Sequence, residues 1–396
     1  MDVADSDCRP PVISLPSLFL KFLRFGTLAF GGPVAQIAMV RQALVEEERW
    51  IDRARFNRLL AILQVLPGPE AHELCVHFGI IARGRVGGLL AGLGFMLPGL
   101  LLMLFAGWAY VALIANQIAL NGVWLGVQTA VLAIILRAVF RIGEHILEDR
   151  LTWAIAIGSA LATLSAAPFW IPLLAGGAIY AMAHRAAIVG LIASVAIVLT
   201  LIFSLVPATA PVVEIANEPL TVAALFIAGL KGGLLTFGGA YTAIPYVRSD
   251  TVGRGWLSDA TFLDGIAIAG LLPAPLVIFA TFVGYVAGGL PGGLAITAGM
   301  FLPAFAFSMI FFERLEAIVQ NPRLHRVLAG VAAAVVGIIA ATFIQLGTAT
   351  TQRLTTPIVA MALFLLALLA AWRLRKTWAT PATLAFGAVV GAALPL

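Results

Sequence analysis

Two positively charged residues occupy matching positions ahead of glycine pairs in apolar stretches of the chain. Arg24 opens the stretch RFGTLAFGGP (24–33), and Lys231 opens KGGLLTFGGA (231–240). A charged side chain near the bilayer centre costs about 2.5–3.5 kcal/mol on insertion scales, so such a residue usually has a function there. Two cations brought to one place would match a doubly charged anion. The alternative is that these long side chains simply reach the lipid headgroups.

Glycine and proline also interrupt the apolar stretches at four places. An interrupted helix in lipid exposes backbone N–H and C=O groups, which is tolerated only where protein or a polar cavity satisfies them. Each new helix begins with free N–H groups and a partial positive charge, which attract anions. Such interruptions at matching places in two halves of a chain point to the binding site of a transporter, whereas the simpler interpretation is close helix packing and bending. The predicted substrate-binding residues are Arg24, Gly31, Gly32, Pro33, Pro67, Gly68, Pro69, Lys231, Gly238, Gly239, Pro273 and Pro275.

The stretch PGPEAHELCVHFG (67–79) concentrates ionisable residues directly after one interruption. Glu70 is the predicted proton-coupling residue, because carboxyl groups inside membranes often carry protons in transporters. His72 and His77 lie at i and i+5, so they do not share a helix face as zinc-binding histidines at i and i+4 do. No metal site and no cofactor are therefore predicted. A membrane-embedded metalloenzyme that uses Glu70, His72, Glu73 and His77 is the alternative from a different functional class.

The composition indicates a chain surrounded by lipid. Of 396 residues, 61% are hydrophobic and only 11% are charged, whereas about a quarter of the residues in a soluble domain are charged. The formal net charge of +5 is spread over loops and predicts no nucleic-acid partner. The predicted fold class is an all-α polytopic membrane protein. We expect about thirteen transmembrane segments, at 16–39, 59–82, 86–115, 122–142, 151–166, 168–183, 186–206, 220–247, 262–287, 291–312, 327–347, 355–372 and 380–395.

The two halves of the chain repeat each other. Superposing Phe30-Gly31-Gly32 on Phe237-Gly238-Gly239 starts a collinear series of matches: Arg24 with Lys231, Arg41 with Arg248, Trp50 with Trp256, LPGP (66–69) with LPAP (272–275), Gly79 with Gly284, and Leu97-Pro98 with Leu302-Pro303. This series predicts an N-terminal repeat (1–206), a turn-rich linker (207–219) and a C-terminal repeat (220–396). Seven segments in the first half make the repeats inverted, as in many secondary transporters, and an even number makes them parallel. Arg41 and Arg248 end their segments, so we predict a solvated or gating role for them.

These motifs resemble the chromate ion transporter family over essentially the whole chain. The residues that carry the resemblance are FGGP (30–33), RW (49–50), LPGPEA (66–71), LP (97–98), and in the second half TFGGAYTAIPYV (236–247) with LPAP (272–275). Ala240 and Ala274 stand where the family pattern has proline and glycine. The resemblance implies a secondary transporter of the bacterial inner membrane that expels chromate and confers chromate resistance. It also implies sulfate as a related oxyanion.

We therefore expect a membrane transporter, and not an enzyme, that exports chromate by alternating access. Sulfate or another tetrahedral anion is the alternative substrate, because its charge and shape are nearly the same. The expected partners are the oxyanion and the lipid bilayer. The sequence leaves open the coupling ion, the direction of transport and the oligomeric state, for which a homodimer is one option.

Overall fold

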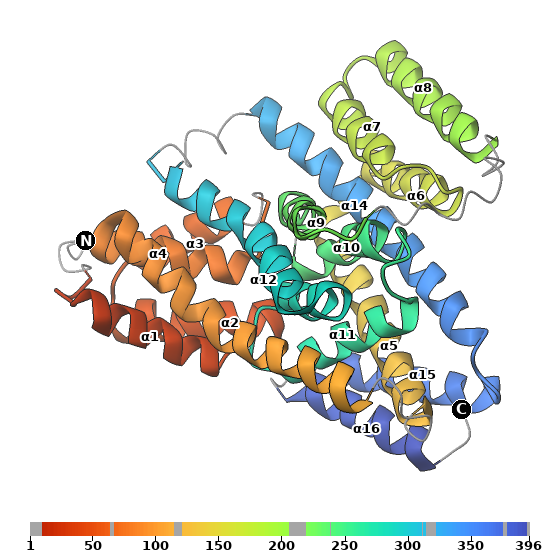
Figure 1. Ribbon diagram of the computed structural model, residues 1–396. Coiled ribbons are helices and arrows are strands. Elements are labelled where there is room, and N and C mark those ends of the chain that lie inside the picture. The colour runs from red at the N-terminus through yellow and green to blue at the C-terminus, as the bar shows by residue number, and fades with distance from the viewer. Residues whose placement is uncertain are drawn as a thin grey trace.

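The computed structural model describes residues 10–63, 67–114, 121–205, 219–237, 239–310, 312–313, 322–374 and 378–393 (Figure 1). Over these residues the structure contains helices and no strand, as the sequence predicts. The first half contains α1 (Leu15–Thr27), α2 (Gly32–Arg41), the π-helical η1 (Gln42–Glu47), α3 (Arg53–Leu63), α4 (Glu70–Ala109), η2 (Tyr110–Ile114), α5 (Asn121–Ile146), α6 (Arg150–Leu164), α7 (Trp170–Ala181) and α8 (Ala186–Leu205). The second half contains α9 (Val222–Leu234), the 3₁₀ turn η4 (Ala240–Ala243), α10 (Ile244–Thr251), α11 (Asp259–Leu271), η5 (Leu276–Ile278), α12 (Phe279–Ile310), α14 (Pro322–Thr351), α15 (Pro357–Arg373) and α16 (Ala379–Ala393).

The four predicted interruptions are present as breaks between helices. The expected segment 16–39 is divided between α1 and α2, and segment 220–247 is divided between α9 and the η4–α10 pair. Segment 59–82 breaks between α3 and α4, and segment 262–287 breaks between α11 and η5. Each break is followed by a new helix, so the chain has four interrupted helices in two matching pairs.

The two longest helices, α4 and α12, each consist of two antiparallel arms. The backbone leaves helical geometry at Arg83–Gly84 in α4 and at Gly288–Gly289 in α12, with φ of 64° at Gly84 and 63° at Gly289. A Cβ atom added at Gly79 would lie 2.4 Å from the carbonyl oxygen of Gly87. Residues eight apart in a straight helix are separated by about 12 Å, so the arms must fold back on each other. The arms are 70–82 and 85–109 in α4, and 279–287 and 290–310 in α12, which matches the predicted ends of four segments.

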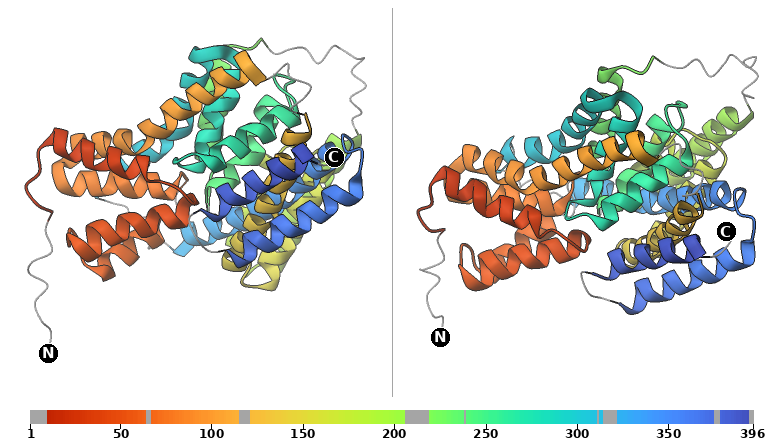
Figure 2. Two further views of the ribbon diagram at one scale, coloured as in Figure 1. Left: turned by 90° about the horizontal axis from the view of Figure 1, so that it is seen from below. Right: turned by 60° about the horizontal axis from the view of Figure 1, so that its bottom comes forward.

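The halves are joined by an exchange of helices. The α6–α7 pair of the first half packs against α14 of the second half, and the α15–α16 pair of the second half packs against α5 of the first half. In Figures 1 and 2 the long α14 runs from α6 and α7 toward α15, while α4 and α12 cross beside α1 and α9. A contact made once in each direction is what a two-fold relation between the halves requires. The repeat predicted from the sequence is therefore visible in the packing.

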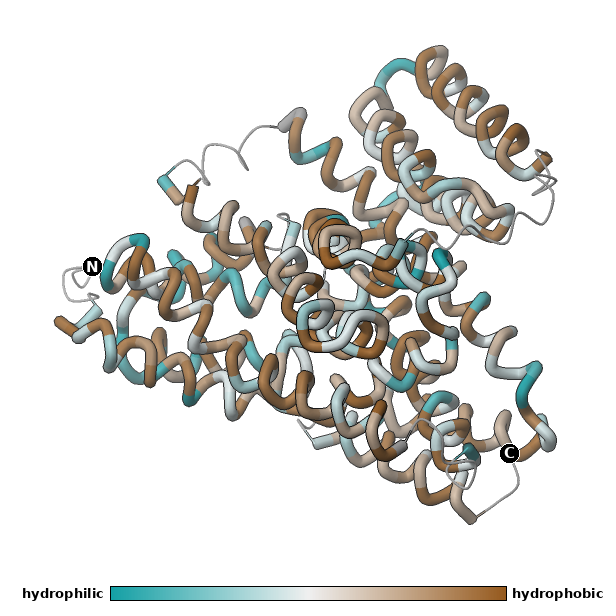
Figure 3. The backbone as a smooth tube through the Cα atoms, in the orientation of Figure 1, coloured by the Kyte–Doolittle hydropathy of each residue, from teal (hydrophilic) through white to brown (hydrophobic). Residues whose placement is uncertain are grey.

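The outer surface of the helices is suited to lipid. Among the described residues, five helical stretches are long and apolar enough to cross a membrane, and the apolar helices α6, α7, α9, α15 and α16 are shorter. The 20-residue helix α8 has none of its apolar window buried in the protein. Figure 3 shows hydrophobic residues along the length of α8 and hydrophilic residues gathered at helix ends and connections. The chain is a multi-pass membrane protein.

The region 151–183 forms two helices, α6 and α7, which are separated near Pro168 as expected. The predicted linker 207–219 lies almost entirely outside the described residues, which resume at residue 219. The repeat boundaries at 206 and 220 therefore remain predictions.

Candidate functional site

The break between α1 and α2 lies against the break between α11 and η5. The fully buried side chain of Gln36 in α2 makes this contact, because its Nε2 atom donates to the carbonyl oxygens of Ala29 and Ala274, each at 2.9 Å. From the second arm of α4, Gly99 also touches this place, since a Cβ there would lie 2.4 Å from the Cβ of Ala274. We call residues 29–33 and 272–275 the first crossing.

The two remaining breaks also meet, and they make the reciprocal contact. The Gly68 N–H, in the break between α3 and α4, donates to the carbonyl oxygen of Thr236 at 2.9 Å. Thr236 lies in the break between α9 and η4. We call residues 67–69 with Thr236 and Gly239 the second crossing. Each crossing pairs one break from the first half with one from the second, as the two-fold relation requires.

The two crossings are next to each other, and four helices begin there. The turns η4 and η5 pack against each other, although η4 follows the second crossing and η5 the first. The helices that begin at the crossings are α2, α4, η4–α10 and η5–α12. The N-terminus of a helix carries about half a positive charge and unsatisfied N–H groups. The crossings therefore gather positive potential and backbone donors from both halves.

Backbone geometry at the breaks explains why glycine is placed there. Gly31 and Gly32 have φ of 86° and 79°, and Gly68 has φ of 147°. These values lie in a region that residues with a side chain rarely adopt, whereas glycine does so at no steric cost. The proline that follows Gly32 occupies the first turn of α2, where its missing N–H has no partner to lose. The predicted residues Gly31, Pro67, Gly68, Pro69, Gly239, Pro273 and Pro275 lie in the breaks, Gly32 and Pro33 begin α2, and Gly238 lies outside the described residues.

Acidic residues distinguish α4 from the other three helices that begin at the crossings. Glu70 and Glu73 lie in the first turn of α4. The first turns of α2, η4, α10, η5 and α12 contain no acidic residue. The partial positive charge at the N-terminus of α4 therefore has carboxyl groups beside it, and the N-termini of the other helices do not. Sequence reasoning predicted proton coupling for Glu70, which is buried, and considered the fully buried Glu73 only as part of the alternative metal site.

Two arginines of α5 act on the second crossing, and sequence reasoning missed both. Arg137 and Arg141 interact electrostatically with Tyr241 in η4, and Arg141 also interacts with Glu70. They are spaced i and i+4, so they share one face of α5. A pair of arginines on one face near the end of an apolar segment was the available signal.

The structure does not bring Arg24 and Lys231 together as a free pair. Arg24 is exposed in the last turn of α1. The Lys231 side chain is 38% exposed and forms an ion pair of 3.1 Å with Asp250 of α10. Both cations precede a break, as the sequence requires, but Lys231 already has a carboxylate partner. Any role for them in binding the anion remains a prediction.

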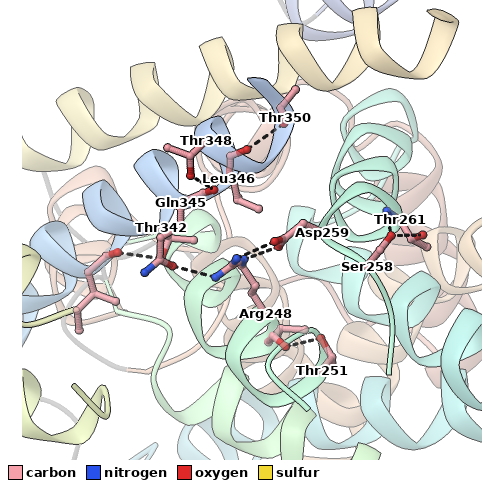
Figure 4. A network of polar contacts seen from close by, with 12 residues as sticks. Arg248, Thr251, Ser258, Asp259, Thr261, Thr342, Gln345, Leu346, Thr348 and Thr350 are labelled. Atoms are coloured by element: carbon pink, nitrogen blue, oxygen red, sulfur yellow. Dashed lines mark hydrogen bonds and ion pairs between the residues drawn. The ribbon is translucent and has the colours of Figure 1, made fainter. Parts of the chain in front are cut away.

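The two other paired arginines, Arg41 and Arg248, are ion-paired in different ways. Figure 4 shows Arg248 holding Asp259 through Nε and Nη2, at 2.6 and 2.8 Å, and donating to Gln345 of α14 at 2.8 Å. Arg41 contacts Glu46 of η1 at 3.3 Å. A hydrogen bond from Arg53 holds the pKa of Glu46 below its usual range, with a further contribution from Arg41. Arg248 thus connects α10, α11 and α14, whereas Arg41 connects η1, through Glu46, with α3, where its guanidinium lies 5.6 Å from the centroid of the Phe56 ring.

The histidine-rich stretch does not form a metal centre in the part of the chain that the structure describes. No group of three His, Cys, Asp or Glu side chains is arranged there to hold a metal ion. His72 packs against the rings of Phe301 and Phe305 of α12, with ring centroids 4.9 and 4.7 Å apart. His72 is thus part of the contact between the halves. What the site offers is a set of backbone donors and arginines suited to a small anion.

Comparison with known proteins identifies relatives over nearly the whole chain. The family model described as "Chromate transporter" matches residues 16–182 and 223–392, once in each half. A "Chromate transport protein" of Pseudomonas aeruginosa is 57% identical over 376 residues, which cover 93% of this chain and 90% of the relative. A "Chromate transport protein" of Cupriavidus metallidurans is 30% identical, covering 89% of this chain and 87% of the relative. A "Probable chromate transport protein" of Synechococcus elongatus is 29% identical, covering 96% of both chains. No solved structure gives a significant match.

Proposed function

The chain belongs to the chromate transporter family, and from this premise we propose that it exports chromate across the bacterial inner membrane. The activity of this family is transport, not catalysis. Export of the toxic oxyanion would lower its concentration in the cell and confer resistance. The observation that carries the proposal beyond the family match is the reciprocal meeting of four interrupted helices at the two crossings.

We propose that chromate binds at the second crossing, with the N-terminus of η4–α10 on one side and α5 on the other. The N-terminal N–H groups would donate to the oxyanion, and the arginines Arg137 and Arg141 would balance its double charge. Arginine suits this role because its planar, delocalised guanidinium donates to oxyanions through several N–H groups. Arg24 and Lys231 would attract the anion as it approaches the breaks. The support is the electrostatic interaction of both α5 arginines with Tyr241 in η4.

The exchange of helices between the halves supports transport by alternating access between inverted repeats. In this mechanism one repeat rocks against the other around a site at their interface. The network of Arg248, Asp259 and Gln345 would act as a gate, because it connects α10 to α11 and α14. Breaking it would free the helix that begins at the second crossing. Arg41, held by Glu46 and by the ring of Phe56, would have the corresponding position in the first half.

Chromate flux into proteoliposomes tests this function. Purified protein is reconstituted, and radiolabelled chromate entry is compared with that into empty liposomes. Removing one charged contact with Arg141→Gln should raise the half-saturating concentration about tenfold, since tenfold corresponds to about 1.4 kcal/mol. The matched control is Arg373→Gln, which removes an exposed arginine at the end of α15 and should leave the flux unchanged. Wild-type flux no faster than in empty liposomes would refute the function, and equal effects of the two variants would refute the site.

Two further measurements decide the direction and the substrate. Cells that contain the protein should tolerate more chromate than cells without it if the direction is export, and less if it is uptake. Sulfate added to the proteoliposomes should compete with chromate, because the two dianions have the same charge and shape. Faster transport of sulfate than of chromate at equal concentration would reassign the physiological substrate.

A further inference from the structure

Glu73 is a completely buried acid whose carboxyl group has no hydrogen-bond partner. Its exposure is 0%, and neither Oε1 nor Oε2 has a partner among the described residues. It is held in the first turn of α4, where its N–H donates to the carbonyl oxygen of Pro69 at 3.1 Å. An ionised carboxylate in such a place costs several kcal/mol unless a cation or donors compensate it. The packed arrangement in this structure therefore suits the neutral carboxylic acid.

The Glu73 side chain is directed at the second crossing. A Cβ atom added at Gly68 would lie 2.5 Å from Glu73 Oε1 and 2.9 Å from Cδ. The carboxyl group thus occupies the space that Gly68 leaves open by having no side chain. Gly68 is also the residue whose N–H donates to the carbonyl oxygen of Thr236. Any movement that opens the second crossing must change the surroundings of this carboxyl group.

Glu73 and Glu70 differ in the charged groups that act on them. Glu70 acts on Glu73 as a like charge, whereas Glu70 itself also interacts electrostatically with a cation, Arg141. The arm of α12 that packs against α4 has no Asp, Glu, Lys, Arg or His between Phe279 and Ile310. Ionisable side chains on the elements packed against α4 are Lys21 and Arg24 of α1, Arg41 of α2, Arg53, Arg55 and Arg58 of α3, Tyr110 of η2, Asp259 and Asp264 of α11, and Tyr285 of α12.

Most of these ionisable groups already interact with other residues. Lys21 is paired with Glu48, and Arg55 acts on His77. Asp264 accepts hydrogen bonds from Tyr110 and Gln128, at 2.8 and 2.7 Å. Among the described residues, the ionisable group that interacts electrostatically with Glu73 is Glu70 in the same turn of α4. In the part of the chain that the structure describes, no cationic side chain compensates a negative charge on Glu73. A bound proton is therefore what neutralises its carboxyl group.

We propose that Glu73 is the proton carrier that couples chromate movement to proton movement, an inference that rests on the proposed function. With the second crossing packed, the carboxyl group carries a proton. When the crossing opens to water, Glu73 releases that proton and becomes a carboxylate. The negative carboxylate repels a dianion at the same crossing and the neutral acid does not, so chromate binds together with the proton and the two move in the same direction. Glu70 differs in that a cation, Arg141, interacts with it electrostatically.

The test separates proton movement from chromate exchange in proteoliposomes. A pH-sensitive dye inside the vesicles reports protons, and potassium with valinomycin clamps the membrane potential so that protons do not move merely to balance charge. Exchange of labelled for unlabelled chromate is measured in parallel, because it requires no net proton movement. The variants are Glu73→Gln, which is permanently neutral, Glu73→Asp, which restores a titrating carboxyl group, and Glu70→Gln as the matched alternative.

We expect the wild type to move protons with chromate, and E73Q to lose proton movement and retain exchange. E73D should recover proton movement, and E70Q should retain it. The inference is overturned if the wild type exchanges chromate without moving protons, if E73Q still moves protons, or if E70Q alone loses them. It is also overturned if E73Q loses exchange as well, since Glu73 would then be structural. Absence of exchange in the wild type would instead refute the proposed function itself.

Discussion

Replacing Gln36 by leucine should destabilise the protein strongly, although the two side chains are similar in size. The Gln36 side chain is 1% exposed, and its Nε2 atom donates to both Ala29 and Ala274 at 2.9 Å. Leucine leaves two buried carbonyl groups without this donor. A buried polar group that loses its partner costs about 1–3 kcal/mol, so we expect a loss of about 2–4 kcal/mol in the free energy of unfolding. Chromate flux should fall as well, because Gln36 connects the two halves at the first crossing.

The measurement is reversible unfolding in mixed detergent micelles, with Gln42→Leu as the control. Gln42 is exposed in η1, and its Nε2 atom donates to Glu47 at 3.1 Å within the same local segment. Surface substitutions of this kind usually change stability by less than about 0.5 kcal/mol. If Q36L and Q42L unfold at the same detergent composition, Gln36 does not hold the first crossing together and our reasoning about it is wrong.

Four further substitutions test other parts of the structure. Gly68→Val should reduce stability by about 1–3 kcal/mol and abolish flux, because the side chain strains the backbone and collides with Glu73, as unfolding and flux assays will show. Arg248→Gln should change the flux more than the affinity for chromate if the residue gates, and a pure loss of affinity would argue for direct binding. Lys231→Gln should weaken chromate affinity while the protein stays folded; an unchanged binding isotherm would remove this cation from the site. Asp149→Ala removes the N-cap of α6 and should cost about 1 kcal/mol of stability without altering transport.

The interrupted helices could be predicted because glycine and proline act locally. A Gly-Gly-Pro sequence ends one helix and begins the next whatever surrounds it, so the break before α2 follows from residues 31–33 alone. The hairpin arms of α4 and α12 were expected for the same reason, as gaps between segments at 83–85 and 288–290. The repeat supplied a second line of evidence, since each break has a counterpart in the other half.

The contacts between the halves could not be predicted, since they depend on which break meets which. Nothing local to Gly68 indicates that its N–H will bind Thr236, and nothing in α2 indicates that Gln36 reaches Ala274. Arg24 and Lys231 were predicted to bind the anion because of their position along the chain. The structure shows Lys231 already paired with Asp250, and it shows Arg137 and Arg141 of α5 interacting electrostatically with Tyr241 in η4.

The difference between the two buried acids also depends on tertiary contacts. Glu70 and Glu73 are three residues apart on one helix, and the sequence offered no reason to prefer the second. Their difference arises from α5, which presents Arg141 to Glu70, and from the glycine that leaves space for the carboxyl group of Glu73. Both causes are tertiary.

A cryo-electron microscopy map of the protein in lipid nanodiscs with chromate would test the central claim most directly. We predict density for the anion at the second crossing, between the N-terminus of η4–α10 and the arginines of α5, and its absence from a matched map without chromate. Chromate density far from both crossings, for example at the exposed Arg24, with the four breaks unchanged and unoccupied, would contradict the account.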